Sequence, residues 1–256
     1  MPTLEENSNR WLNKKMWLEE DNKGDAWSAV WGGTPYLWSG TILPRILKFL
    51  PAGHILEIAP GFGRCTQYLI DYAQETTLVD ISSVCIEHCQ ERFKNYSNIN
   101  YYANDGKSLD MIKDNSIDFI FSWDSMVHAE SDVLRDYIQQ SKRILKPEGI
   151  GFIHHSNIGT YKDNGKIGKI PVPKRHWRAE SMNAGLFRKY CQEAGLKCIS
   201  QELLDWGESG YLIDCISLYT KDSKGLAGET RITENIDFMK EAHNLRRISE
   251  IYDVAR

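Results

Sequence analysis

The sequence lacks a long hydrophobic run, an excess of basic residues and closely paired cysteines. A helix that spans a membrane needs about 20 consecutive apolar residues, and no stretch of this chain comes near that length. Residues 1–22 are polar and include early acidic side chains, so they lack the apolar core of a signal peptide. We therefore expect a cytoplasmic protein with no membrane span.

The charge balance is slightly acidic, because 31 Lys and Arg residues stand against 35 Asp and Glu residues, a net charge of −4. Such a chain lacks the positive field of a general nucleic-acid binder, so we expect no nucleic-acid partner. The six cysteines form no C-x-x-C pair, and a chain of 256 residues can bury a core that needs no disulfide. These features indicate a reducing compartment.

The sequence contains short apolar runs that alternate with helical patterns. The expected strands are residues 54–59, 76–80, 98–103, 117–123, 149–155, 197–203 and 211–219. This alternation predicts a parallel sheet with helices on both faces. The link between the last two strands is too short for a crossover, so the seventh strand should be antiparallel. The predicted fold is α/β, a Rossmann-like doubly wound seven-stranded sheet, mostly parallel with strand seven antiparallel.

Acidic residues stand at the ends of four successive predicted strands. Ligands of such sheets bind at the carboxyl ends of the strands, near the point where the strand order reverses. Taken singly, the glycines there could form a tight turn, Asp80 a helix cap and Asp105 a turn. Their joint order predicts a ligand site instead, built from Glu57, Gly61, Gly63, Asp80, Asp105, Asp124 and His155.

The first glycine loop does not fit a dinucleotide. Counted from Gly61, the third glycine of G-x-G-x-x-G is replaced by Thr66. Glu57, just before the loop, would repel phosphate but attract an ammonium group. Asp80 lies where an acid grips ribose hydroxyls. A nucleoside with an amino-acid tail and no phosphate fits this arrangement, and S-adenosylmethionine is such a cofactor.

Ile55–Arg64 (I-L-E-I-A-P-G-F-G-R) resembles the first motif of the class I S-adenosylmethionine-dependent methyltransferases, with Ala59 in place of one glycine. The resemblance extends to Asp80, residues 104–106, residues 122–124 and the turn at 145–149, and so spans about residues 50–220. It implies that the cofactor is bound by Glu57, Ala59, Gly61, Gly63, Arg64, Asp80, Ile81, Asp105, Gly106 and Trp123.

The resemblance also suggests three parts. Residues 41–221 would be the S-adenosylmethionine-binding methyltransferase domain. Residues 1–40, rich in tryptophan, would be a helical lid over the cofactor, although these aromatic residues could equally pack the segment onto the sheet. Residues 222–256 would be a linker and an amphipathic helix, which is a candidate contact for a homo-oligomer.

The acceptor determines which further residues the reaction needs. A hydroxyl acceptor must lose its proton as it attacks, which calls for a general base or a metal ion. Methyltransferases of DNA bases and glutamine amides share a D/N-P-P-Y/F element, whereas residues 122–128 read S-W-D-S-M-V-H, which disfavours those two classes of acceptor. This segment places Asp124 and His128 beside the expected methyl group, and His155 stands at the end of the fifth strand. We therefore expect His128, His155 and Asp124 to be catalytic. The plainer alternative for His128 is a residue that merely caps or packs a helix. A less favoured alternative makes Asp124, His155 and Asn157 ligands of a divalent cation, and we assign no metal site.

The loop after the fifth strand carries many basic residues and emerges at the catalytic edge, where it would suit a phosphate-bearing substrate. The set of motifs resembles small bacterial methyltransferases of sugars and surface polysaccharides. This resemblance suggests O-methylation of a sugar or sugar-phosphate, a small-molecule or glycan substrate, bound by Trp31, Tyr36, Trp38, Asn157, Arg175, His176 and Arg178.

Three alternatives remain open from the sequence. Another small molecule with a phosphate-type group or an amine could be the acceptor, and an amine would need no histidine base. A nicotinamide oxidoreductase would bind NAD instead, and the missing third glycine of the dinucleotide motif is evidence against this alternative. A partner subunit that binds the cofactor would transfer no methyl group.

Overall fold

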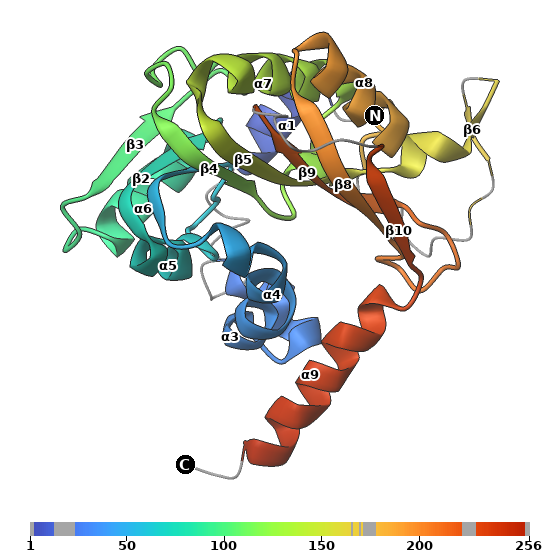
Figure 1. Cartoon of the computed structure of the whole chain (residues 1–256). Coiled ribbons are helices and arrows are strands. Elements are labelled where there is room, and N and C mark those ends of the chain that lie inside the picture. The colour runs from blue at the N-terminus through green and yellow to red at the C-terminus, as the bar shows by residue number, and fades with distance from the viewer. Residues whose placement is uncertain are drawn as a thin grey trace.

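The computed structural model describes residues 3–12, 24–164, 166–168, 170, 178–221 and 229–253. These residues form one eight-stranded sheet with helices on both faces, and a small two-stranded sheet beside it (Figure 1). The order of the large sheet is β10-β8-β9-β5-β4-β1-β2-β3. The order reverses between β1 and β4, which puts the expected ligand site at their carboxyl ends.

The strands are β1 (Ala52–Ile58), β2 (Ala73–Asp80), β3 (Ile99–Ala103), β4 (Ile117–Ser122), β5 (Leu145–Ser156), β8 (Lys197–Leu204), β9 (Asp214–Thr220) and β10 (Arg231–Asn235), and β6 (Lys162–Asp163) pairs with β7 (Lys166–Ile167). Strand β9 is antiparallel to both β5 and β8, and the other pairs of the large sheet are parallel. The predicted Rossmann-like topology with an antiparallel strand is confirmed.

The predicted number of seven strands is wrong, because β10 adds an eighth. It pairs in parallel with β8, from Arg231 opposite Ser200 to Asn235 opposite Leu204. Its side chains are mostly exposed, so the segment has no apolar run to mark it as a strand in the sequence. The strand exists because it satisfies the backbone groups of the β8 edge, which no other strand covers.

Helices α7 and α8 cover one face of the sheet, and α4, α5 and α6 lie on the other (Figure 1). The helical segments are α1 (Leu4–Trp11), η1 (Asp25–Trp31), α3 (Thr34–Leu37), η2 (Trp38–Ile42), α4 (Leu43–Ile46), η3 (Leu47–Phe49), α5 (Thr66–Leu69), η4 (Ile70–Tyr72), α6 (Ser83–Arg92), η5 (Met126–His128), α7 (Ser131–Ile144), η6 (Ile158–Tyr161), α8 (Ala184–Glu193) and α9 (Phe238–Tyr252). Within the described residues, no helix combines the length and the apolarity that a bilayer crossing requires.

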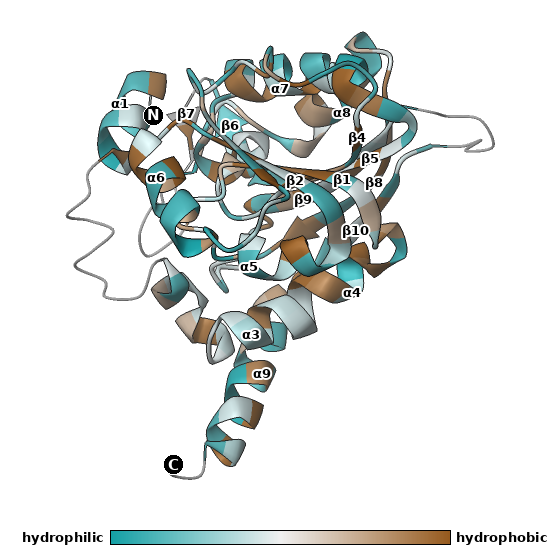
Figure 2. Cartoon of the chain, turned by 90° about the vertical axis from the view of Figure 1, so that its left-hand side faces the viewer, coloured by the Kyte–Doolittle hydropathy of each residue, from teal (hydrophilic) through white to brown (hydrophobic). Residues whose placement is uncertain are grey.

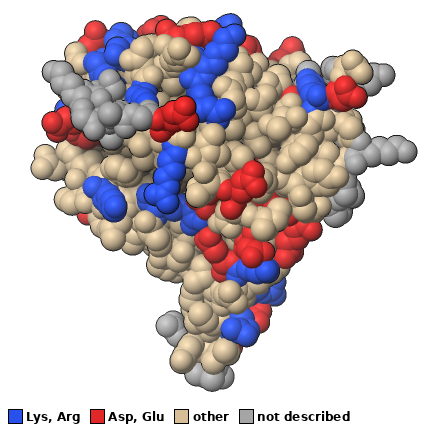
Figure 3. Space-filling view, turned by 45° about the vertical axis from the view of Figure 1, so that its right-hand side comes forward, with Lys and Arg blue, Asp and Glu red and all other residues tan. Residues whose placement is uncertain are grey.

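The buried core has two main clusters, one on each face of the sheet. One cluster packs α7 and α8 against the strands through residues such as Leu134, Ile138 and Phe187. The other joins the N-terminal segment to α9, with Trp31 and Phe238 at its centre. Residues 31–50 and α9 therefore meet on one face, whereas α1 lies apart from α9, which continues away from the body toward the C-terminus (Figure 2). On the face shown in Figure 3, basic and acidic side chains are interspersed.

Candidate functional site

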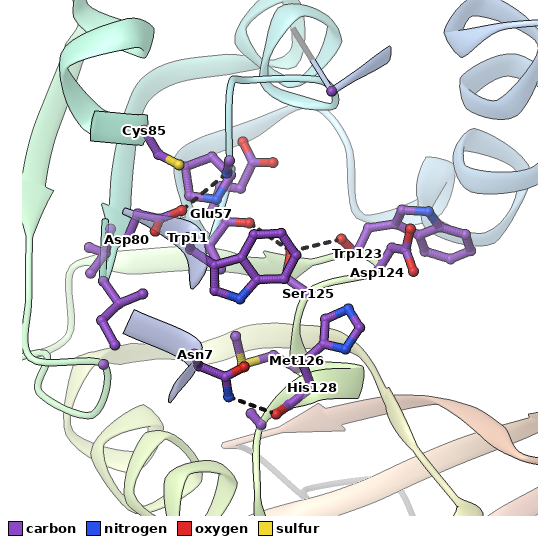
Figure 4. A pocket seen from close by; sticks show the side chains of 18 of the residues that line it. Asn7, Trp11, Glu57, Asp80, Cys85, Trp123, Asp124, Ser125, Met126 and His128 are labelled. Carbon is purple, nitrogen blue, oxygen red and sulfur yellow. Dashed lines mark hydrogen bonds between the residues drawn. The ribbon is translucent and has the colours of Figure 1, made fainter. Parts of the chain in front are cut away.

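A cavity opens at the carboxyl ends of β1, β2 and β4, between the glycine loop and α1 (Figure 4). Its empty space is about 960 Å³, open solvent at the mouth included. Ten of the residues that the sequence assigned to the site line it: Glu57, Ala59, Gly61, Arg64, Asp80, Ile81, Gly106, Trp123, Asp124 and His128.

The glycine loop is tied to the end of β2. The Gly61 amide donates to Asp80 Oδ2 at 3.1 Å, and the Ser82 amide donates to Asp80 Oδ1 at 2.8 Å. Ala59 has a φ of +56° and Gly61 a φ of +57°. This left-handed conformation favours glycine, which explains why the family pattern has one where this chain has Ala59. This turn places the backbone of residues 59–61 at the wall of the cavity.

Two buried carboxyl groups face this cavity. Glu57 is 3% exposed, and Thr66 Oγ1 donates to its Oε2 at 2.6 Å. Burial raises the pKa of Glu57 to about 7 despite the Thr66 hydrogen bond, and burial raises the pKa of Asp80 to about 6. Carboxyl oxygens accept hydrogen bonds from hydroxyl and ammonium groups but not from phosphates. The residues therefore fit S-adenosylmethionine, with Asp80 for ribose hydroxyls and Glu57 on the side of the amino-acid tail.

Asp124 and Arg64 form an ion pair on the opposite side of the cavity from Asp80 (Figure 4). Arg64 Nη2 lies 3.1 Å from Asp124 Oδ2, and the guanidinium lies 5.9 Å from the centre of the Trp27 ring. Asp124 has a φ of +58°, which is rare for a residue other than glycine. The Arg64 side chain is therefore already paired with Asp124, and it would have to contact both Asp124 and the cofactor to fulfil its predicted role.

Helix α1, which lies within the expected lid of residues 1–40, forms a wall of the cavity through three residues that the sequence analysis did not name. Leu4, Asn7 and Trp11 line the space. Asn7 Nδ2 donates to the His128 carbonyl at 3.0 Å, and Ser82 Oγ donates to the Trp11 carbonyl at 2.8 Å. A capping box between Thr3 and Glu6 begins this helix. That pattern is readable from the sequence and could have located the helix, but not its docking onto the cavity.

The aromatic residues predicted for substrate binding are corrected by the structure. Trp31 is buried in the core, where its Nε1 donates to Thr41 Oγ1, and Trp38 stacks on Tyr68 at 5.2 Å between ring centres. Neither they nor Tyr36 line the cavity, whereas Trp11 and Trp27 do. Spacing could not separate these tryptophans, because their roles depend on how the N-terminal segment folds back over the sheet.

The prediction that His155 is a catalytic base is also corrected. Its ring is fully buried against Phe187, and Nε2 lies 2.8 Å from Ser217 Oγ. Burial lowers the pKa of His155 to about 3. The ring therefore lies on the side of the sheet that α8 covers, away from the cavity. His154, the other histidine at the end of β5, lies toward Trp123 and Asp124.

Asn157 and Arg178 support the scaffold instead of lining the cavity. Asn157 Nδ2 donates to the Leu212 carbonyl and its Oδ1 accepts from the Ala184 amide. Arg178 is ion-paired with Asp214. The cation-site alternative is contradicted, because Asp124, His155 and Asn157 do not converge. Among the described residues, no three His, Cys, Asp or Glu side chains are grouped to hold a metal ion.

Gly63 and Asp105 lie outside the lining of the cavity. At Gly63 a β-carbon would meet Phe93 of the α6 region, so this glycine allows packing. Asp105 accepts hydrogen bonds from the Lys107 and Ser108 amides and shapes an exposed turn. Arg175 and His176, also predicted for substrate binding, lie outside the described residues.

Residues 55–149 match the family model described as a methyltransferase domain. Phosphoethanolamine N-methyltransferase 1 of Triticum aestivum is 28% identical over 214 residues, which cover 79% of this chain and 41% of that protein. A second protein of Triticum aestivum, phosphoethanolamine N-methyltransferase, is 27% identical over 216 residues, which cover 79% of this chain and 40% of that protein. The chain thus spans less than half the length of these curated relatives.

Two solved structures show the same fold. The PH0226 protein of Pyrococcus horikoshii OT3 aligns with a TM-score of 0.58 at 19% identity, over 83% of this chain and 98% of that chain. A candidate sarcosine dimethylglycine methyltransferase of Galdieria sulphuraria aligns with a TM-score of 0.56 at 19% identity, over 77% of this chain and 85% of that chain.

Proposed function

We infer that this chain, an S-adenosylmethionine-dependent methyltransferase by its matched domain and its relatives, methylates the amine of a small molecule. The domain match supports the predicted enzyme class and cofactor over a nicotinamide oxidoreductase. The amine was the alternative acceptor in the sequence analysis. Both curated relatives are named as phosphoethanolamine N-methyltransferases, which favours an amine over a sugar as the acceptor.

The observation that carries this proposal is the combination of aromatic rings and a carboxylate around one end of the cavity. Trp11 and Trp27 meet edge to face with 6.0 Å between ring centres, and Asp124 lines the same cavity, where the Arg64 guanidinium pairs with it and lies 5.9 Å from the Trp27 ring centre. Indole faces and carboxylates attract ammonium groups through cation–π and ionic interactions. The two indole rings and the Asp124 carboxylate would hold the ammonium group of an amine substrate and orient its nitrogen.

Bound S-adenosylmethionine supplies the methyl group on a sulfonium, for an in-line displacement by the acceptor nitrogen. The residues of this chain orient the two reactants and exclude water, which is the main requirement of such a displacement. An amine held as its ammonium must first lose a proton, which can pass to solvent before the neutral nitrogen attacks with its lone pair, so the step does not depend on His128 as a base. Helix α1 covers the cavity and would shield the transfer.

An oxygen acceptor, including a sugar or sugar-phosphate, is the second candidate, and one observation favours it. Among the described residues that line the cavity, His128 is the one histidine, and its ring centre lies 5.6 Å from that of Trp11. A histidine at the transfer end of the cavity, the end lined by Asp124 and His128, could accept the proton of a hydroxyl as it attacks.

The test compares acceptors and a His128 variant. The purified chain is incubated with S-adenosylmethionine and phosphoethanolamine, ethanolamine, sarcosine or nucleotide-activated sugars, and methylated products are detected by mass spectrometry. We expect methylation of an amine, and turnover of the His128→Asn variant within about threefold of the original. Methylation of sugars only, with turnover lost by about a hundredfold in His128→Asn, would overturn the amine proposal in favour of the oxygen acceptor.

A further inference from the structure

His154 lies directly behind the cavity wall and contacts the backbone of a residue that lines the cavity. The Asp124 amide donates to His154 Nδ1 at 3.2 Å. On its other side, His154 Nε2 lies 3.2 Å from Asp214 Oδ2, and neither the His154 nor the Asp214 side chain is exposed. The imidazole therefore bridges the end of β4, where Asp124 stands, and the start of β9, where Asp214 stands.

Asp214 is held as a carboxylate by Arg178. Arg178 Nε donates to Asp214 Oδ1 at 2.8 Å, and Nη2 donates to Oδ2 at 2.7 Å. Burial acts to raise the pKa of Asp214, but Arg178 and His154 outweigh burial and leave the pKa below its ordinary value. The guanidinium also lies 5.6 Å from the centre of the Trp206 ring, which stacks on His154 at 5.0 Å. This network is buried and fixes the ring in place.

The hydrogen bonds determine the tautomer of His154. A carboxylate only accepts hydrogen bonds, so Nε2 must carry the proton that it donates to Asp214. Nδ1 accepts from the Asp124 amide, so Nδ1 must carry no proton. A proton on Nδ1 would set two donors against each other and break the contact with Asp124.

We propose that His154 is a positioning residue for methyl transfer, which holds the backbone of Asp124 in its left-handed conformation so that the Asp124 carboxylate stays at the cavity. The φ of +58° at Asp124 is unfavourable by itself and needs such support from its surroundings. The chain Arg178–Asp214–His154–Asp124 thereby links the loop after β5 to the transfer end of the cavity. The kinetic readout of this proposal rests on the proposed function, and a second readout does not.

Two substitutions separate the contacts of the two ring nitrogens. The His154→Asn variant keeps an acceptor near the position of Nδ1 and loses the donor to Asp214. The His154→Gln variant keeps a donor near the position of Nε2 and loses the acceptor for the Asp124 amide. His155→Asn and His155→Gln are matched controls, because His155 is the equally buried neighbour on β5 and its ring nitrogens contact Ser156 and Ser217.

We expect His154→Gln to lower kcat/KM for the acceptor by tenfold to a hundredfold, and His154→Asn to stay within about threefold. The affinity for S-adenosylhomocysteine, measured by calorimetry, should be unchanged in both variants. Equal losses in both His154 variants, or the same pattern in the His155 controls, would show that His154 only stabilises the fold. Thermal unfolding of all four variants identifies any that fail to fold.

The second readout needs no acceptor and so separates this proposal from the proposed function. Nitrogen-15 NMR of labelled histidine should show His154 as the tautomer protonated on Nε2, with its signal assigned by its loss in His154→Asn. Hydrogen exchange of the Asp124 amide should be slow in the original chain and in His154→Asn, and faster in His154→Gln. A proton on Nδ1, or an Asp124 amide that exchanges equally in all three proteins, would overturn the proposal.

Discussion

At the scale of single residues, the two carboxyl groups of the cavity are buried, yet binding the ammonium and hydroxyl groups of the cofactor requires their charged forms. Glu57 and Asp80 stand at the ends of two adjacent parallel strands, and both have raised pKa values because they are buried. A cofactor with hydroxyl and ammonium groups would compensate this burial when it binds. Without the cofactor, the charged forms are unfavourable, and this has consequences for stability and affinity.

The stability of the ligand-free protein should therefore depend on Glu57. The pKa of Glu57 rises from 4.5 to about 7 on folding, so between these values the folded protein binds more protons than the unfolded chain. The free energy of unfolding then falls as the pH rises through this range and levels off above it. In Glu57→Gln this fall should be smaller by about 3 kcal/mol, measured by denaturant unfolding at pH 4.5 to 8. Parallel pH profiles for the two proteins would contradict this expectation.

Asp80 should carry much of the affinity for the cofactor. Asp80→Asn removes the charge and an acceptor, so we expect the Kd of S-adenosylhomocysteine to rise by about 10- to 100-fold. Calorimetric titration measures this change. Asp105→Asn is the matched control, because Asp105 caps an exposed turn outside the cavity and should change the Kd by less than about threefold. A similar loss in Asp105→Asn would restore the cofactor contact that the resemblance implies for Asp105.

At the scale of secondary structure, α1 has the contacts expected of a cover for the cavity. It is attached to two separate walls, to α6 at Ser82 and to η5 at His128. Its inner side chains Leu4, Asn7 and Trp11 come from one face of the helix, as the spacing of three and four residues requires. Within residues 1–40, the proposed lid therefore rests on α1, because Trp31 and Trp38 of the same range pack in the core.

Loosening α1 should speed the release of the cofactor product. Asn7→Ala removes the donor to the His128 carbonyl, so we expect S-adenosylhomocysteine to dissociate about 3- to 10-fold faster, measured by stopped-flow tryptophan fluorescence. Asn9→Ala makes the same substitution at an exposed position of the same helix and should leave the rate unchanged. If both variants release the product at the original rate, α1 does not limit its exit.

At the scale of the whole molecule, the C-terminal segment closes the fold on the face away from α7 and α8. Arg45 of α4 joins three elements, because its Nη2 lies 2.7 Å from Glu202 Oε1 on β8 and 2.8 Å from Glu241 Oε1 on α9. Asn235 of β10 donates to the same two carboxylates. The eighth strand, the last described helix and the N-terminal segment therefore share one polar cluster beside the core around Trp31.

Arg45→Ala should destabilise the protein without changing cofactor binding. It leaves the partly buried Glu202 and Glu241 facing each other, with side chains 23% and 33% exposed. We expect a loss of about 1–3 kcal/mol in unfolding free energy, below the value for a fully buried pair because solvent screens the charges. Arg247→Ala, at an exposed position on α9, is the control. An altered Kd for S-adenosylhomocysteine would show that this cluster is coupled to the distant cavity.

The sequence by itself determined the order of strands and helices and the acidic residues at the strand ends. These features are local: a strand is marked by its apolar run, and the carboxyl ends of parallel strands must meet at one edge of the sheet. Glu57, Asp80 and Asp124 could therefore be placed at one site. Only the tertiary structure decided which of His154 and His155 faces that site, because both faces of a central strand are buried and hydropathy does not distinguish them.

The tertiary structure also decided which tryptophans line the cavity and that residues 231–235 form a strand. Trp11 and Trp31 are equally apolar, and their positions follow from how α1 and η1 dock on different parts of the molecule. Strand β10 is polar, and it forms because the edge of β8 offers unpaired backbone groups. Docking of this kind depends on surfaces that exist only once the sheet has assembled, so local patterns in the sequence carry little information about it.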